Sequence, residues 1–244
     1  MCDFFALYDC LCDNIRSDDL IKLTGAGDVW ALAETELHSG MAMHVHGSSR
    51  PQIFPDGMDG ISLRRAAEAV RSWNNTEASL AMAAINTFYN TEERLSALCC
   101  YEPFENYCTR GIDFSGKTVG IVGHMHGTDE MHRDAREIFT LEREPRGGDY
   151  PDPACDYLLP QCDIVLITGS AITNKTLPHL LDLCRNAYTI LVGPSVPMCP
   201  ELLDFGIDRL SGLVITDRDG IRERIAAGIG GSPYGHGKSF LLVK

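Results

Sequence analysis

The sequence contains two H-x-H pairs, and this spacing of histidines suggests metal binding. His44 and His46 form one pair and His124 and His126 the other. Because alternate residues of a strand share a face, His44 and His46 could present two imidazoles to one metal ion. We favour the alternative that they are ordinary polar residues on the exposed face of a hairpin. His124 differs, because it follows the apolar run at residues 117–123, and open α/β sheets bind ligands where their strands end.

Two glycine-rich segments resemble phosphate-binding motifs only in part. The segment GIDFSGKT, residues 111–118, fits the pattern G-x-x-x-x-G-K-[ST], which binds phosphate only when a helix follows it. Here Thr118 opens a strand, so we expect Lys117 to be a solvated residue without a nucleotide. Around Gly123 the glycine spacing does not match a dinucleotide fingerprint, although Glu142 lies where a ribose-binding acid is expected. Two interpretations of these glycines therefore stay open. They could bind a nucleotide-like ligand, or they could simply let a helix pack close to a strand.

Two later loops follow apolar runs of strand character. They are TGSAITNKT, residues 168–176, and GPSVP, residues 193–197. If the strands are parallel, both loops open on the same edge as Gly123, and their amides and hydroxyls converge on a ligand. Prolines fix the shape of such a loop and lower the entropy of the unfolded chain. A plain helix entry at Pro200 is the alternative, but it leaves residues 193–197 unexplained.

Polar residues also occur in an otherwise apolar helical segment, residues 75–90. Glu77 and Asn86 lie among its alanines, and a buried polar side chain needs a partner. Asn86 could brace the neighbouring hairpin, or it could contact a ligand from the side opposite the loops.

The elements that must position these residues change character near residue 110. The first part is predicted to contain a helix at the N-terminus, an antiparallel hairpin turning at Ser39-Gly40, and helices at 62–73 and 75–90. From residue 117 onward, strands that are apolar throughout alternate with helices, which is typical of a parallel sheet covered on both faces. The predicted strands are 117–123, 139–144, 162–169, 188–193 and 212–217, and the predicted helices are 127–138, 151–159, 175–187, 200–205 and 218–228. We therefore expect an α/β protein with a domain at residues 1–110 and a Rossmann-like domain at residues 111–244.

Composition narrows the range of partners. The chain has 244 residues, 44% of them apolar, and a formal charge of -13, which argues against a nucleic-acid or anionic-membrane partner. No apolar run approaches the roughly 20 residues that span a bilayer. The ten cysteines, without a secretory leader, indicate reduced thiols in a cytoplasmic protein. The acidic surface and the apolar first helix permit a homodimer.

Several of these segments together resemble a known family. The segments SWNNTEASLAMAAINTFYN, VGHMHG, LERE, GDYPDPACDYLLPQCDIVLITGSAITNKTL and VGPSVPMCPELLDFGIDRLSGLVITD are similar to the family described as putative heavy-metal chelation proteins, whose two parts are catalogued as domains of unknown function. The resemblance implies an N-terminal α+β domain similar to the enolase N-terminal fold, a C-terminal Rossmann-like domain with a mostly parallel sheet, and a ligand site in the cleft between them. The ligand-binding residues carried over are those inside matching motifs: Glu77, Asn86, Gly123, His124, Glu142, Asp149, Gly169, Asn174, Gly193, Pro194 and Ser195.

Two functions of different class follow. In the first, the chain binds a metal ion or a small metal-chelating or metallated ligand, with His124, Glu142 and Asp149 as the metal-binding set. Cys199 is the only cysteine near these loops, so a thiolate cage is not expected. In the second, the chain is an enzyme acting on a small anionic or nucleotide-like molecule, with Glu142 or His124 as general base and residues 193–197 binding an oxygen.

Overall fold

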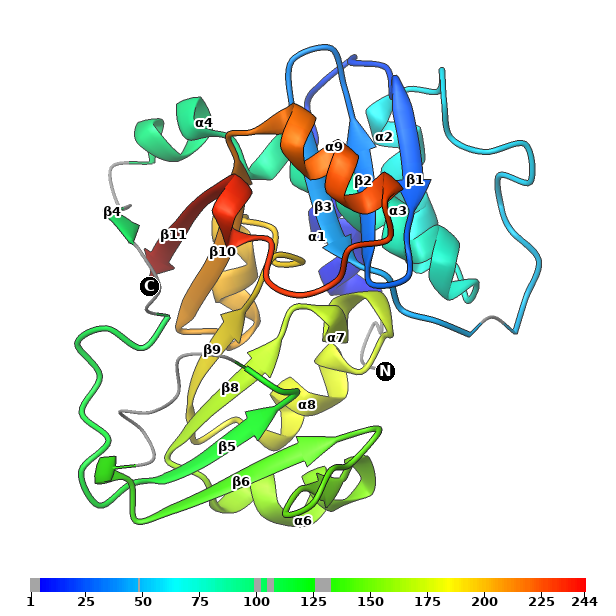
Figure 1. Ribbon diagram of the computed structural model, residues 1–244. Coiled ribbons are helices and arrows are strands. Elements are labelled where there is room, and N and C mark those ends of the chain that lie inside the picture. The colour runs from blue at the N-terminus through cyan, green and yellow to red at the C-terminus, as the bar shows by residue number, and fades with distance from the viewer. Residues whose placement is uncertain (1–4, 48, 99–101, 105–107, 126–132) are drawn as a thin grey trace.

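The computed structural model describes residues 5–47, 49–98, 102–104, 108–125 and 133–244, and within these ranges the chain forms two sheets. The larger sheet has eight strands in the order β4-β11-β10-β9-β8-β5-β6-β7, and the smaller has three in the order β1-β2-β3 (Figure 1). Strands β5 to β10 all pair in parallel, whereas β11 and β4 complete the sheet in antiparallel pairings. The predicted α/β fold with a mostly parallel sheet is therefore confirmed.

The strands of the larger sheet have the following bounds: β4 (Glu102–Phe104), β5 (Thr118–Val122), β6 (Glu137–Glu142), β7 (Tyr150–Pro151), β8 (Ile164–Thr168), β9 (Tyr188–Val192), β10 (Arg209–Ile215) and β11 (Gly237–Val243). The same part of the chain contains the helices α6 (Cys155–Leu158), α7 (Ser170–Thr173), α8 (Leu177–Leu183) and α9 (Arg218–Ala226), with short 3-10 turns η2 (Asp152–Ala154), η3 (Leu159–Gln161), η4 (Pro200–Phe205) and η5 (Tyr234–His236).

The central strands are apolar throughout because both of their faces are covered. Alternate residues of β8 enter two different cores, Val165 and Ile167 on one face and Ile164 and Leu166 on the other. Val119 of β5 pairs in parallel with Ile164, as a strand-helix-strand crossover requires. Thr118 is the first residue of β5, so the segment at 111–118 leads into a strand and lacks the helix that a phosphate-binding loop needs.

The N-terminal part consists of helices on one face of the small antiparallel sheet. Its elements are α1 (Ala6–Asp13), β1 (Leu23–Ala26), β2 (Trp30–Glu34), β3 (Ser39–Met43), α2 (Leu63–Ala67), η1 (Glu68–Arg71), α3 (Asn75–Tyr89) and α4 (Glu92–Ala97). The predicted hairpin is confirmed as β2 and β3, but Ser39 and Gly40 lie within β3 and the turn precedes them. Gly40 is required there, because a Cβ atom would lie 2.3 Å from the carbonyl oxygen of Ala83 on α3. None of the described helices is long and apolar enough to cross a bilayer.

Two elements connect the first and second parts of the chain. Helix α9 packs on the small sheet, where Ile221 and Ile225 meet Trp30 and Leu32, so the sheet lies between α3 and α9 (Figure 1). Strand β4 belongs by sequence to the first part but pairs with β11 in the larger sheet. The division into domains at 1–110 and 111–244 stays a prediction, since both elements extend across it.

Several predicted elements need correction. The segment 200–205 forms the 3-10 helix η4, with Pro200 at its first position and Gly206 ending it in the left-handed conformation. Strand β6 begins at Glu137, so the helix predicted for 127–138 cannot extend that far, and residues 126–132 lie outside the described part of the chain. Strands β1, β4, β7 and β11 were not predicted.

Candidate functional site

Three adjacent strands end on one edge of the larger sheet, and each is followed by a glycine. β5, β8 and β9 lead into Gly123, Gly169 and Gly193, and the arrowheads of β5 and β8 point to the same side in Figure 1. Gly123 has φ +94° and Gly193 has φ +118°, values that side chains rarely allow. At Gly169 a Cβ atom would lie 2.9 Å from the backbone nitrogen of Val196. The prediction that these loops share one edge is confirmed, and the glycines let two of them touch.

His124, Glu142 and Asp149 meet at this edge and are called the His124 cluster below. Nδ1 of His124 lies 3.1 Å from Oε1 of Glu142, and Nε2 lies 2.9 Å from Oδ2 of Asp149. The backbone N–H of His124 also donates to Oε1 of Glu142, at 2.8 Å. The side chains of Glu142 and Asp149 are 22% and 11% exposed, so the imidazole is held between two largely covered carboxylates.

The donor set of the His124 cluster suits a borderline cation, because it combines imidazole nitrogen with carboxylate oxygen. The two carboxylates lie against opposite ring nitrogens, so the three groups do not converge on one point. In the ranges that the structure describes, no group of three or more His, Cys, Asp or Glu side chains is arranged to hold a metal ion. A metal at this cluster would therefore use one ring nitrogen and one carboxylate, and the second carboxylate would orient the ring.

The polar atoms of the loop at residues 193–197 form hydrogen bonds with the N-terminal part of the chain. The hydroxyl of Ser195, which is 3% exposed, accepts a hydrogen bond from the N–H of Met43 at 2.8 Å. Nδ2 of Asn86 donates to the carbonyl oxygen of Pro194 at 3.2 Å and to that of Met41 at 2.8 Å. These bonds attach β3 and α3 to the sheet edge, and a contact of Ser195 with a ligand stays a prediction.

Asn86 nevertheless keeps one unusual feature. It is 1% exposed, and no described group donates to its buried Oδ1. Asn90, one turn later, has both ends of its side chain satisfied: Nδ2 donates to Val196 and Leu213, and Oδ1 accepts from the N–H of Met198 at 2.8 Å. Asn90 therefore has a partner for both its amide nitrogen and its amide oxygen, whereas the oxygen of Asn86 has none among the described residues.

Asn174 and Glu77 also have partners close by. Oδ1 of Asn174 accepts from the hydroxyl of Thr176 at 2.6 Å and from its N–H at 3.1 Å. The buried carboxylate of Glu77 accepts from the backbone N–H groups of Ile53 and Phe54 at 3.0 and 2.7 Å. Each therefore braces a loop: Asn174 its own, and Glu77 the segment before α2.

Lys175, which the sequence did not single out, lies between these two residues. It is the one non-glycine residue with positive φ in the described ranges, at +67°, and its ammonium donates to the carbonyl oxygen of Thr173 at 2.7 Å. Burial lowers the pKa of Lys175 to about 8, although the nearby Glu77 carboxylate opposes the shift. Its ammonium also lies 5.9 Å from the ring centre of Trp73. A lysine in an Asn-Lys-Thr loop carries no sequence signal that distinguishes it from a solvated one.

His44 and His46 lie just beyond the end of β3, and their rings lie on the same side of the chain, as expected, with centroids 4.3 Å apart. The ring nitrogens of His44 bond to the carbonyl oxygen of Gly27 at 2.7 Å and to the hydroxyl of Thr76 at 2.9 Å. His46 bonds to the carbonyl oxygen of Asp28 at 2.7 Å. Both histidines therefore fasten loops together, which agrees with the favoured non-metal interpretation. His126 lies outside the described residues.

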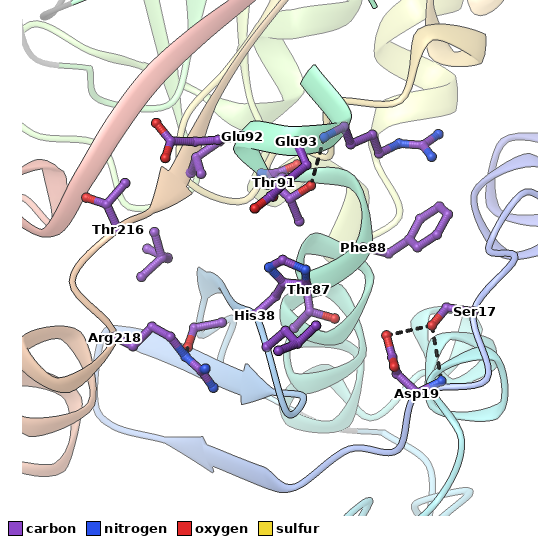
Figure 2. Close-up of a pocket in the computed structure, with 16 residues that line it drawn as sticks. Ser17, Asp19, His38, Thr87, Phe88, Thr91, Glu92, Glu93, Thr216 and Arg218 are labelled. Carbon is purple, nitrogen blue, oxygen red and sulfur yellow. Dashed lines mark hydrogen bonds between the residues drawn. The ribbon is translucent and has the colours of Figure 1, made fainter. Parts of the chain in front are cut away.

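A cavity of about 680 Å³ lies elsewhere along the same sheet edge, at the end of β10 (Figure 2). Its walls come from the hairpin turn, the junction of α3 with α4, and β10. Arg218 contributes a side chain, but its guanidinium is already bonded to Ser39, Thr35 and Glu36. The predicted site residues do not line it. Its labelled lining residues are Ser17, Asp19, His38, Thr87, Phe88, Thr91, Glu92, Glu93, Thr216 and Arg218.

Comparisons with known proteins agree with the resemblance noted in the sequence. Two family models match, both described as "Putative heavy-metal chelation", over residues 112–243 and residues 8–89. A crystal structure of a protein of unknown function from the DUF364 family of Desulfitobacterium hafniense is similar with a TM-score of 0.88 and 31% identity, over 99% of this chain and 98% of that one.

Two further relatives extend the comparison. A DUF364-family structure from Pyrococcus horikoshii has a TM-score of 0.81 and 19% identity over 98% of this chain and 100% of that one, a likeness of fold alone. A protein of Methanocaldococcus jannaschii, named as uncharacterised, is 30% identical over 156 residues, which are 61% of this chain and 58% of that relative's length.

Proposed function

This chain belongs to the family described as "Putative heavy-metal chelation", and from that membership we propose that it binds a metal ion carried by a small chelating ligand. The protein ligands are Nε2 of His124 and the carboxylate of Asp149. The site lies at the edge of the parallel sheet that faces the N-terminal part of the chain. The observation that carries the proposal is the His124 cluster, with its imidazole held between two carboxylates.

The two carboxylates have different roles in this proposal. Oε1 of Glu142 accepts the backbone N–H of His124 and lies 3.1 Å from Nδ1, to which we assign the ring proton, so Glu142 fixes the ring and its tautomer. Nε2 then has its lone pair available toward Asp149. A carboxylate behind the imidazole of a metal ligand orients the ring and raises its basicity. Glu142 is therefore a positioning residue, while His124 and Asp149 are the ligands.

A chelated metal fits the site better than a bare ion. His124 and Asp149 provide two donors, and borderline cations take four to six. The imidazole is 37% exposed, so a small molecule can approach it from solvent. Organic oxygen or nitrogen donors on that molecule would complete the coordination.

Metal competition against a coloured chelator tests this proposal in protein made without a histidine tag. Ni²⁺ or Zn²⁺ should bind with and without a small carboxylate chelator such as citrate, and more tightly with it. His124→Ala and Asp149→Asn should each lower the affinity at least tenfold, and Glu142→Gln should lower it by roughly ten- to a hundredfold. His179→Ala is the matched control, because His179 forms a similar pair with Asp156, at 2.7 Å, on an exposed helix. Equal affinity in the wild type and His124→Ala would refute the proposal.

An enzyme is the second candidate function, and the same contact between His124 and Glu142 favours it. A carboxylate close to one ring nitrogen of a histidine orients the other nitrogen as a general base, which here is His124 beside Glu142. Lys175, with its lowered pKa, would hold an anionic substrate. Chemical conversion of a small anionic molecule by metal-free protein, lost in His124→Ala, would support this function over the first.

A further inference from the structure

Lys175 has an unusual backbone conformation in the loop that follows β8 and α7. It comes directly after Asn174, the residue that caps the end of α7, and its φ is +67°. Glycine normally occupies such a left-handed position after a helix, because a side chain there costs conformational energy. The chain instead keeps a long side chain at this position, and residues held in this way are concentrated at functional sites.

Hydrogen bonds fix the loop on both sides of Lys175. The N–H of Lys175 donates to the carbonyl oxygen of Ile172 at 3.1 Å. Oδ1 of Asn174 accepts from both the N–H and the hydroxyl of Thr176. The side-chain nitrogen of Lys175 donates to the carbonyl oxygen of Thr173 at 2.7 Å. The loop therefore sets the position of Nζ, whereas the side chain of a solvated lysine moves freely.

An exposed aromatic ring lies beside this nitrogen. Trp73, the second residue after η1, is 52% exposed, and its ring centre lies 5.9 Å from Nζ of Lys175. Aromatic rings that stack with an offset have centres roughly 4.5–7 Å apart. A flat ring that stacks on the indole therefore brings a substituent within reach of Nζ. The two residues come from the first and second parts of the chain, so the pair exists only in the folded protein.

The charge state of this amine supports a nucleophilic role. Burial lowers the pKa of Lys175 to about 8, and the Glu77 carboxylate opposes this shift without cancelling it. An ordinary lysine has a pKa of about 10.4 and is almost wholly protonated at pH 7.5. A desolvated lysine that is partly neutral has a lone pair for attack on a carbonyl carbon. The bond to Thr173 uses only an N–H group of the amine and leaves that lone pair unused.

We propose that Lys175 is a nucleophilic amine that forms an imine with a flat aromatic aldehyde stacked on Trp73. The neutral amine attacks the carbonyl carbon and forms a C–N bond, while one amine proton moves to the carbonyl oxygen. The resulting hydroxyl group then leaves with the second amine proton as water, which gives the imine. The step needs no oxidant or reductant, and it uses none of the three residues of the His124 cluster.

Reductive labelling of the full-length chain with salicylaldehyde and cyanoborohydride tests this proposal. At pH 7.5 and limiting aldehyde, peptide mass spectrometry should find Lys175 labelled roughly ten- to a hundredfold faster than Lys117. The ratio reflects the larger neutral fraction of the Lys175 amine, offset by its lower basicity. Lys117 is the internal control, because it is exposed directly before β5. Both amines belong to the same folded molecule, so this comparison needs no variant.

Variants of Trp73 test the aromatic part of the proposal. Trp73→Ala should slow the labelling of Lys175 by salicylaldehyde roughly three- to tenfold, the scale of one lost aromatic stacking contact. Glycolaldehyde, which has no ring, should label Lys175 in this variant at nearly the wild-type rate. Trp73→Phe should restore the preference for salicylaldehyde, because it keeps an aromatic face.

The outcomes distinguish this site from the proposed function. Labelling of Lys175 no faster than that of Lys117 would overturn the proposal. Equal rates for the two aldehydes in the wild type, or equal slowing of both in Trp73→Ala, would overturn the assignment of an aromatic ligand. His124→Ala should be labelled at Lys175 as fast as the wild type, so failure of the His124 cluster to bind nickel would leave this result unchanged.

Discussion

Replacing Asn86 by alanine tests whether the contact between α3 and the loop at 193–197 is structural. The side chain of Asn86 donates to the carbonyl oxygens of Met41 and Pro194, which belong to β3 and to the glycine loop after β9. The substitution removes both N–H donors, and it leaves the carbonyl oxygen of Met41 unpaired in a buried place and that of Pro194 unpaired in a partly buried one. It also removes the unpaired Oδ1 of Asn86, which offsets part of the loss.

The magnitude follows from these contacts. Each buried acceptor left without a donor costs about 1–3 kcal/mol, and removal of the unpaired oxygen returns a similar amount once. With the small cavity left by the missing carboxamide, we expect Asn86→Ala to lower the free energy of unfolding by about 2–4 kcal/mol. For a chain of this length, that corresponds to a melting temperature lower by roughly 5–15 °C.

Urea and thermal unfolding of Asn86→Ala measure this loss directly. Asn75→Ala is the matched control: its amide donates to the carbonyl oxygen of His46 at 3.0 Å in an exposed position, so its loss should cost about 1 kcal/mol or less. Nickel affinity should be unchanged in both variants. A melting temperature within about 2 °C of the wild type, together with weakened ligand binding, would show that Asn86 serves the ligand and would refute the structural reasoning.

Two further predictions concern lysines. The pKa of Lys175 is about 8 in the folded chain and 10.5 ordinarily, so between these pH values the unfolded chain holds more protons and the stability of the fold rises with pH. The stability that Lys175→Met gains over the wild type should therefore shrink between pH 7.5 and 10. A gain that is independent of pH in urea titrations would contradict the lowered pKa. Lys117→Ala should leave ligand affinity unchanged, and calorimetry should detect no ATP binding in the wild type, because Thr118 opens a strand; ATP binding that this substitution abolishes would contradict the argument.

The main part of the fold could be predicted because its strands have an unambiguous pattern. β5 and β8 are apolar except for one terminal threonine each, and each is followed by a glycine, which predicted both the parallel sheet and the edge at which its loops meet. β11 was missed because it is an antiparallel strand that follows a glycine-rich segment, so no crossover helix precedes it to indicate a strand. β1 has only four residues, including Gly25, and its pattern is too short to recognise.

The candidate site was predictable in membership but not in arrangement. His124, Glu142 and Asp149 could be grouped because they follow neighbouring strands or lie close to one, yet only coordinates show the imidazole between the carboxylates. The packing of α1 against η4 depends on tertiary contacts that no local pattern encodes. The partners of Asn86 and Ser195 are likewise backbone groups, whose availability depends on tertiary packing.

Anomalous diffraction from a crystal grown with nickel and citrate tests the central claim most directly. The account predicts one strong nickel peak at the sheet edge, within bonding distance of Nε2 of His124 and a carboxylate oxygen of Asp149, with the citrate completing the coordination. Glu142 should remain bonded to Nδ1 of the same ring. A nickel peak bound elsewhere on the chain, with His124 still bonded to both carboxylates, would contradict the account.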